Sequence, residues 1–154
     1  MVRLSDLPDV DVTHLLGKEC DAFETSPWVS GPPVAERRVA IITTAGLHRR
    51  DDRSFDIRDT GYRVIPGDVA AKDLVMSHSS VNYDRTGFQQ DTNVVFPIDR
   101  LRELKAAGEI GSLARFHYSL MGAGWLPHEI EPTAIELAGM LKEDKVNAVL
   151  LSPV

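Results

Sequence analysis

The chain has 154 residues, of which 43% are hydrophobic and 26% charged, and its formal net charge is −6 at pH 7. This length and composition are typical of one globular domain with its own core. The negative charge argues against nucleic acid or an acidic membrane as a partner, because both would be repelled. No apolar run is long enough to cross a bilayer and the first residues do not form a signal peptide, so a soluble cytoplasmic protein is expected.

The single cysteine, Cys20, rules out an internal disulfide and any Cys-x-x-Cys metal or redox pair. We interpret it as a small buried residue of a helix, because only Lys18 stands nearby to activate a thiol. That helix is predicted over residues 11–24 by the spacing of apolar side chains, with Asp11 as its N-cap. Residues 26–33 contain proline and glycine breakers and predict a connecting loop, which Trp28 is expected to anchor to the core.

Residues 38–44 form the clearest strand of the sequence. They are apolar and rich in β-branched side chains without alternation, as in strands that are buried on both faces of a parallel sheet. A polar segment, residues 45–52, follows and contains His48. Ligands of open α/β sheets bind beyond the carboxyl ends of strands, so this segment is expected either to line a site or to be a solvated turn.

The remaining chain alternates between strand and helix patterns. The predicted elements are a short strand within residues 61–68, a strand at 74–76, a helix from Pro97 to Gly108, a strand at 113–120, a helix opening at Pro132, and a strand at 146–151. This alternation predicts one α/β domain over residues 1–154, with a mainly parallel sheet flanked by helices. Residues 1–37 are its N-terminal helix and loop. Because the last strand lacks a helix to cover it, we expect the N-terminal portion of a larger α/β fold.

The stretch from residue 76 to residue 91 joins two apolar runs and is dense in polar side chains, which is where sites tend to form. His78 follows a predicted strand directly and is the candidate general acid or base, because imidazole titrates near neutral pH. The alternative is a structural histidine bonded to the loop backbone. Arg85 could bind a substrate carboxylate, or instead pair with Asp84 or Asp91.

The rest of the predicted substrate-binding set is Ser79, Ser80, Asn82, Asp84 and His48. The hydroxyl and amide groups could instead cap the turn that follows. His48, His78 and Asp84 could in principle bind a metal ion, but their spacing matches no recognised ligand pattern, so no metal site is predicted. His117 lies within a predicted strand and is expected to be a core or cross-strand residue.

Several of these segments, taken in order, resemble one known family. The matching residues are 39–48, 62–66, 77–91, 93–101, 142–144 and 148–154. The pattern is similar to the selenoprotein B family of glycine, sarcosine, betaine and D-proline reductases, and within it most to the small subunits of D-proline reductases. The resemblance implies reductive cleavage of a C–N bond in an amino acid or related amine. It also implies partner subunits, one of which carries a pyruvoyl group.

In that family, a strand ending like Pro153-Val154 is followed directly by selenocysteine or cysteine. The resemblance therefore implies a selenol or thiol just past Val154, and we expect the chain to end at a selenocysteine codon and to be inactive alone. The alternative is a short, non-catalytic binding or assembly subunit, or a homo-oligomer, because an unpaired final strand recruits partners. A hydrolase that activates water with His78 and Asp84 is a third alternative, although no nucleophile or metal pattern supports it.

Overall fold

The structure is a computed structural model that describes residues 3–17, 24, 26, 28–80 and 83–154. Its first α-helix, α1 (Asp9–Leu16), buries no side chain. The helix begins two residues before the expected cap at Asp11, and Pro8 occupies the N-cap position. The expected extent to residue 24 is wrong, because the helix ends at Leu16 with Gly17 as its C-cap and Glu24 is not helical. Residues 18–23, which include Cys20, lie outside the described residues. The expectation for Trp28 is wrong, because its side chain is 89% exposed and anchors nothing.

The central sheet is built around β1 (Arg38–Thr43). Strand β1 pairs in parallel with β5 (Ser112–Leu113), β6 (Phe116–Leu120) and β7 (Ala148–Ser152). The remaining strand of this sheet, β3 (Tyr62–Pro66), is antiparallel to β6. The predicted mainly parallel α/β sheet is therefore confirmed, although the strand expected at residues 113–120 is divided between β5 and β6.

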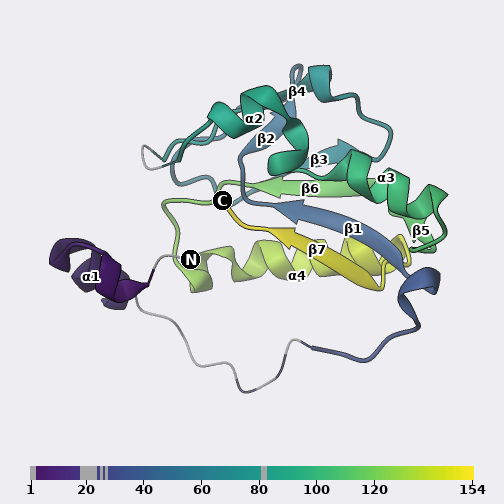
Figure 1. The fold of residues 1–154 in the computed structure, drawn as a ribbon, viewed down its shortest axis with the longest axis horizontal. Helices are drawn as coiled ribbons and strands as arrows, with labels where there is room; N and C mark the ends of the chain where they lie inside the picture. The colour runs from purple at the N-terminus through teal and green to yellow at the C-terminus, as the bar shows by residue number, and fades with distance from the viewer. Residues whose placement is uncertain (1–2, 18–23, 25, 27, 81–82) are drawn as a thin grey trace.

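The register brings the carboxyl ends of three strands to one edge, which we call the carboxyl edge. Thr43 of β1 lies opposite Ser119 of β6 and Ser152 of β7. The arrowheads of these strands all point to this edge, where the C-terminus also lies (Figure 1). The N–H of Val154 donates to the Thr44 hydroxyl at 2.9 Å, so the last residues are tied to the end of β1.

A second, two-stranded sheet consists of β2 (Leu47–Arg49) and β4 (Leu74–Met76), which pair antiparallel. The strand at 74–76 was predicted, but residues 47–49 were expected to be loop. Leu47 and His48 are in fact buried, at 0% and 4% exposure. Backbone pairing with β4 and the burial of Leu47 outweigh the charged neighbours, and a three-residue strand is too short to carry a periodic signal.

Helices cover both faces of the central sheet. Helices α2 (Thr86–Gln90) and α3 (Ile98–Ala106) lie on one face with the small sheet, and α4 (Pro127–Glu143) lies on the other (Figure 1). As predicted, α3 ends just before Gly108, which has a positive φ of 75°. The described residues also include short 3-10 helices at Leu4–Asp6, Val34–Glu36, Ala71–Asp73 and Thr92–Val94. None of the described helices combines the length and apolar character needed to cross a membrane.

The start predicted for the last helix is wrong. Helix α4 begins at Pro127, five residues before Pro132, which lies inside it. A carboxylate oxygen of Glu129 accepts the N–H of Leu126 at 2.6 Å and so caps the helix. Either proline is tolerated near a helix start, and this acidic cap selects the earlier one.

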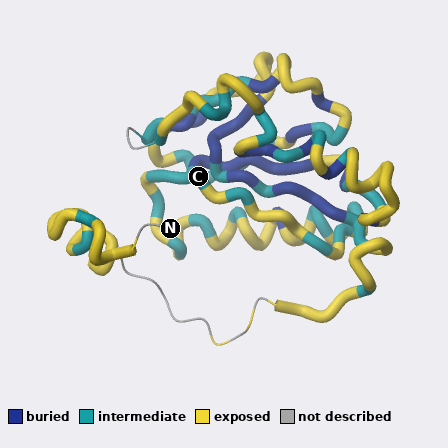
Figure 2. Tube along the Cα trace, in the orientation of Figure 1, coloured by how far each residue is buried: buried dark blue, intermediate teal, exposed yellow. Residues whose placement is uncertain are grey.

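Apolar side chains form one cluster on each face of the sheet. The larger cluster, on the face of α2 and α3, includes Ile41, Ile65 and Phe96, all at 0% exposure. The smaller cluster packs Leu137 of α4 against Tyr118 and Leu120 of β6. Strand β7 is an exception, because Val149, Leu150 and Leu151 are between 37% and 66% exposed (Figure 2).

His117 of β6 is a core residue, as expected from the sequence. It is 0% exposed, and its Nδ1 accepts the N–H of Ile41 at 2.9 Å. The ring packs edge-on against Phe96. Burial lowers the pKa of His117 to about 4, with the charge of Arg102 acting in the same direction, so the ring is neutral at pH 7.

We predict that this histidine makes the protein sensitive to mild acid. Its folded-state pKa of about 4 lies below the ordinary value of 6.5, so the neutral ring stabilises the fold fully above pH 6.5. Between pH 7 and pH 4 the free energy of unfolding should fall by about 3 kcal/mol through this group alone. Urea denaturation at both pH values, compared with His117→Asn, measures this contribution, because asparagine keeps an acceptor for Ile41. Equal pH dependence in the two proteins would contradict the prediction.

Candidate functional site

The polar stretch after β4 lies at the carboxyl edge. We call residues 77–80 and 83–85 the His78 loop; Asn82, a predicted binding residue, lies outside the described residues. The N–H of Ser77 donates to the carbonyl of Gly46 at 3.0 Å, and the N–H of Gly46 donates to the carbonyl of Leu120 at 2.9 Å. These bonds attach the loop to the ends of β1 and β6. The sequence predicts such a location, because the loop directly follows a predicted strand.

Gly46 allows this close approach. Its φ is +63°, a left-handed conformation that side chains disfavour. A Cβ at this position would lie 3.0 Å from the backbone nitrogen of His78 and 3.1 Å from its Cα. The glycine therefore makes the turn out of β1 and lets the His78 backbone pack directly against it.

His78 is buried within the loop, at 4% exposure. Its Nδ1 accepts the N–H of Ser80 at 3.2 Å, so a neutral ring carries its proton on Nε2. That Nε2 is buried and has no hydrogen-bond partner among the described residues. Burial lowers the pKa of His78, and the charge of Arg85 lowers it further. At neutral pH the site thus holds a neutral imidazole with an unused N–H donor.

Arg85 braces the backbone of the loop. Its guanidinium donates to the carbonyl of His78 and, at 3.5 Å, to that of Ser80. The ion pair with Asp84 or Asp91 that we considered is not among those of the described residues. Asp84 instead accepts from Thr86, and Asp91 from Asn93, and these hydrogen bonds lower the pKa of each carboxyl.

The structure thus brings His78, Ser79, Ser80, Asp84 and Arg85 into one loop. The hydroxyl of Ser79 contacts the sulfur of Met121 at 3.5 Å, just past the end of β6. His48 is placed differently, on β2, where its Nδ1–H donates to the carbonyl of Arg49 at 2.7 Å. Its binding role stays a prediction. Within the described residues, no three His, Cys, Asp or Glu side chains gather as a metal site.

Two neighbours of His78 were not selected from the sequence. The ring of Tyr83 lies 5.1 Å from that of His78, and Met121 contacts Ser79. Tyr83 stands within the stretch that resembles the reductases, so its position in that motif could have identified it as a candidate site residue. Met121 comes close only through the pairing of β6 with β1, which no local pattern reveals.

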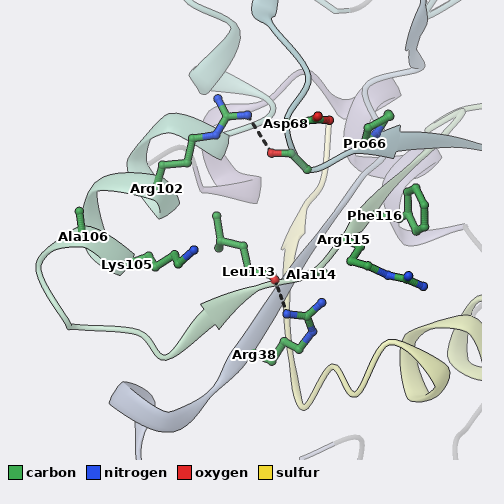
Figure 3. A pocket seen from close by; sticks show the side chains of 11 residues that line it. Arg38, Pro66, Asp68, Arg102, Lys105, Ala106, Leu113, Ala114, Arg115 and Phe116 are labelled. Carbon is green, nitrogen blue, oxygen red and sulfur yellow. Dashed lines mark hydrogen bonds between the residues drawn. The ribbon is translucent and has the colours of Figure 1, made fainter.

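Two cavities of the described surface lie away from the His78 loop. A cavity of about 750 Å³ lies at the opposite edge of the sheet, where Arg38 begins β1 and Phe116 begins β6 (Figure 3). The second, of about 600 Å³, lies beside Arg49 and Asp73. We place the site at the carboxyl edge because the buried, unused donor of His78 lies there. If the cavities alone were considered, the site would be placed at the opposite edge of the sheet.

We predict that Gly46→Ala disturbs the His78 loop. Alanine at a left-handed position costs about 1–2 kcal/mol, and at Gly46 the contact with His78 adds to this cost. Gly108→Ala is the matched control, since φ there is +75° but no atom lies within 4 Å of the added Cβ. In urea denaturation Gly46→Ala should lose more stability than Gly108→Ala. Only Gly46→Ala should shift the NMR signals of the His78 ring; unchanged signals would contradict the prediction.

Known proteins match most of the length of the chain. Residues 33–154 match the pattern of the family described as glycine/sarcosine/betaine reductase selenoprotein B. D-proline reductase subunit gamma of Acetoanaerobium sticklandii is 37% identical over 149 residues, which cover 92% of this chain and 61% of the relative. Sarcosine reductase complex component B subunit beta of Peptoclostridium acidaminophilum is 33% identical over 121 residues, which cover 75% and 27%.

A third relative is glycine reductase complex component B subunit gamma of Symbiobacterium thermophilum, 28% identical over 130 residues, which cover 79% of this chain and 30% of the relative. The chain thus spans 61% of the D-proline reductase subunit and under a third of the other two. No solved structure matches the chain. Because the family pattern covers residues 33–154, well over half of the sequence, the chain belongs to the glycine/sarcosine/betaine reductase selenoprotein B family.

Proposed function

We propose that the chain is part of a reductase subunit that binds a small amino acid or related amine at the carboxyl edge and takes part in reductive cleavage of its C–N bond. Membership of the family and the names of the relatives support the reaction class. One observation carries the location. The stretch that resembles the reductases is hydrogen-bonded to the ends of β1 and β6, beside the last residues of β7.

In this proposal His78 is a hydrogen-bond donor to the substrate. With Nδ1 occupied by Ser80, the neutral ring offers Nε2–H, which suits a carboxylate oxygen or the substrate nitrogen. The tautomer therefore favours donation over the general-base role that the sequence left open. Since Nε2 is buried, substrate can reach it only if neighbouring groups move, and we propose that the Tyr83 ring, whose centre lies 5.1 Å from that of His78, is the group that shifts.

The other predicted binding residues would surround the substrate. Arg85 holds the carbonyl of His78, so it positions the imidazole and also places positive charge near a substrate carboxylate. Ser79, Ser80, Asn82 and Asp84 belong to the same stretch and are proposed as further contacts. His48, one strand away on β2, is the outermost member of the set.

The chemistry also needs a selenol or thiol. The only cysteine, Cys20, lies outside the described residues. We propose that a selenocysteine or cysteine directly past Val154 is the nucleophile that displaces the substrate amine. A second thiol would then attack the selenium or sulfur of the adduct and release the reduced product, so that the pair supplies the two electrons and ends as a selenenyl sulfide or disulfide. The N–H of Val154 is bonded to the Thr44 hydroxyl just past the end of β1, so a group at the next position would stand at the carboxyl edge. A partner subunit would supply the pyruvoyl carbonyl that activates the substrate amine.

Reading the gene beyond the Val154 codon tests the source of the nucleophile. We expect a UGA codon followed by an open frame with a nearby cysteine codon. An ordinary stop codon with no coding frame behind it would contradict this part of the proposal.

A non-catalytic assembly subunit is the second candidate function. The exposed apolar side chains of β7 favour it, since an edge strand with Val149, Leu150 and Leu151 at the surface invites pairing with another chain. The partners would be other reductase subunits or a second copy of the chain. This candidate becomes the leading one if the gene holds no selenol or thiol codon past Val154.

The role of His78 is tested in the complete reductase, assembled with its partner subunits. His78→Asn keeps an acceptor for Ser80 but removes Nε2–H, and should lower kcat/KM by about 100-fold or more. His128→Gln, at an exposed position of α4, is the control and should leave kcat/KM unchanged. Product formation from each candidate amino acid is measured, with urea denaturation as a check on folding. Equal activity of the two folded variants would rule out His78 as a catalytic residue.

A further inference from the structure

The cavity at the opposite edge of the sheet is a separate feature, which we call the basic cleft. It has a volume of about 750 Å³, within the range of small-molecule sites. Helix α3 forms one wall and the starts of β1 and β6 form the other, with Leu113 and Ala114 between them (Figure 3). The cleft lies where the strands begin, so it does not depend on the function proposed for the carboxyl edge.

Four basic side chains line the cleft, namely Arg38, Arg102, Lys105 and Arg115. Two of them are already engaged. Arg38 pairs with Asp144 at 2.6 Å, and Arg102 pairs with Asp99 at 2.7 Å. These arginines also donate to backbone carbonyls, Arg38 to that of Leu113 and Arg102 to that of Gly67. Both arginines form part of the walls of the cleft, and few of their N–H donors remain to bind a ligand.

Lys105 and Arg115 remain available. Among the described residues, the Lys105 ammonium has no ion pair or hydrogen bond, and it projects into the cleft (Figure 3). The Arg115 side chain is 73% exposed, and its Nε lies 3.4 Å from a carboxylate oxygen of Asp144 that Arg38 already holds more closely. Asp68 is the one carboxylate of the lining. The available groups therefore carry two positive charges against one negative charge.

The lining also offers apolar surface. Phe116 is 38% exposed, and it lies under the Arg115 guanidinium, 5.5 Å from ring centre to Cζ. Leu113 and Ala114 continue this surface along the floor. Cations beside an aromatic ring and aliphatic side chains suit a ligand with a charged head and an apolar body. The whole chain has a net charge of −6, so a surface that attracts anions differs from the chain as a whole.

We propose that the basic cleft binds a small organic anion whose phosphate or carboxylate group contacts Lys105 and whose apolar body lies along Leu113 towards Phe116, while Arg115 adds positive charge on the Phe116 side of the cleft. Lys105 could instead have a purely structural role. It stands in the last turn of α3, where a positive charge interacts favourably with the helix dipole. Lys142 stands in the last turn of α4 in the same way and is not among the residues that line the cleft. It therefore serves as the matched control.

The test is a titration of the full chain at low salt with phenyl phosphate and benzoate as probes, followed by NMR. We expect saturable shifts of backbone amides around the cleft, Lys105 and Phe116 among them. Lys105→Ala should weaken binding about tenfold, because it removes a charge-assisted hydrogen bond, and Arg115→Ala should weaken binding less, because it removes only a nearby positive charge. Lys142→Ala should leave the affinity unchanged. Asp68→Asn should tighten binding, because it removes the repelling carboxylate.

Any of four results would overturn the proposal. Shifts that do not saturate at millimolar probe, or equal weakening by Lys105→Ala and Lys142→Ala, would exclude a built anion site. Inorganic phosphate binding as tightly as phenyl phosphate would exclude the apolar part of the ligand. Tighter binding of a short glutamate peptide than of either probe would instead identify a docking surface for an acidic segment of a partner.

Discussion

The fold depends on the pairing of β1 with β6 on one side and β7 on the other, both in parallel and in register. Because parallel strands end at the same edge, this pairing gathers Thr43, Ser119 and Ser152 at one place. The His78 loop and the last residues of the chain are both hydrogen-bonded there. If β1 were moved by one residue, its buried side chains would face the wrong side and the loop would lose its attachment.

A buried donor without an acceptor costs about 1–3 kcal/mol, so His78 Nε2–H calls for an explanation. An unpaired donor is not sufficient by itself, because His117, whose Nδ1 also accepts a hydrogen bond, has a buried Nε2–H without a partner among the described residues. The unpaired Nε2 of His48 is an acceptor, since Nδ1–H of that ring is the donor. His117 is accounted for as a core residue that caps the N–H of Ile41. What distinguishes His78 is its position at the carboxyl edge, in the stretch that resembles the reductases. A substrate acceptor at Nε2 would recover the cost.

The long elements could be predicted from sequence because their signals are local. The apolar run of β1, and Pro97 and Gly108 at the ends of α3, act through neighbouring residues alone. Strand β2 could not be predicted, since its three residues become a strand only by pairing with β4. The start of α4 was missed because Pro127 and Pro132 carry the same signal and the Glu129 cap decides between them. His78 could be named as a candidate from the sequence, but the tautomer of its ring required the position of the Ser80 N–H.

The two edges of the sheet differ in character. One holds a buried neutral imidazole and the end of the chain, and the other holds an open basic cleft. The most direct test is a structure of the assembled reductase with its amino-acid substrate bound. The account predicts the substrate at the carboxyl edge, within hydrogen-bonding distance of His78 Nε2 and with the Tyr83 ring displaced. Substrate bound in the basic cleft, with His78 Nε2 still buried, would contradict it.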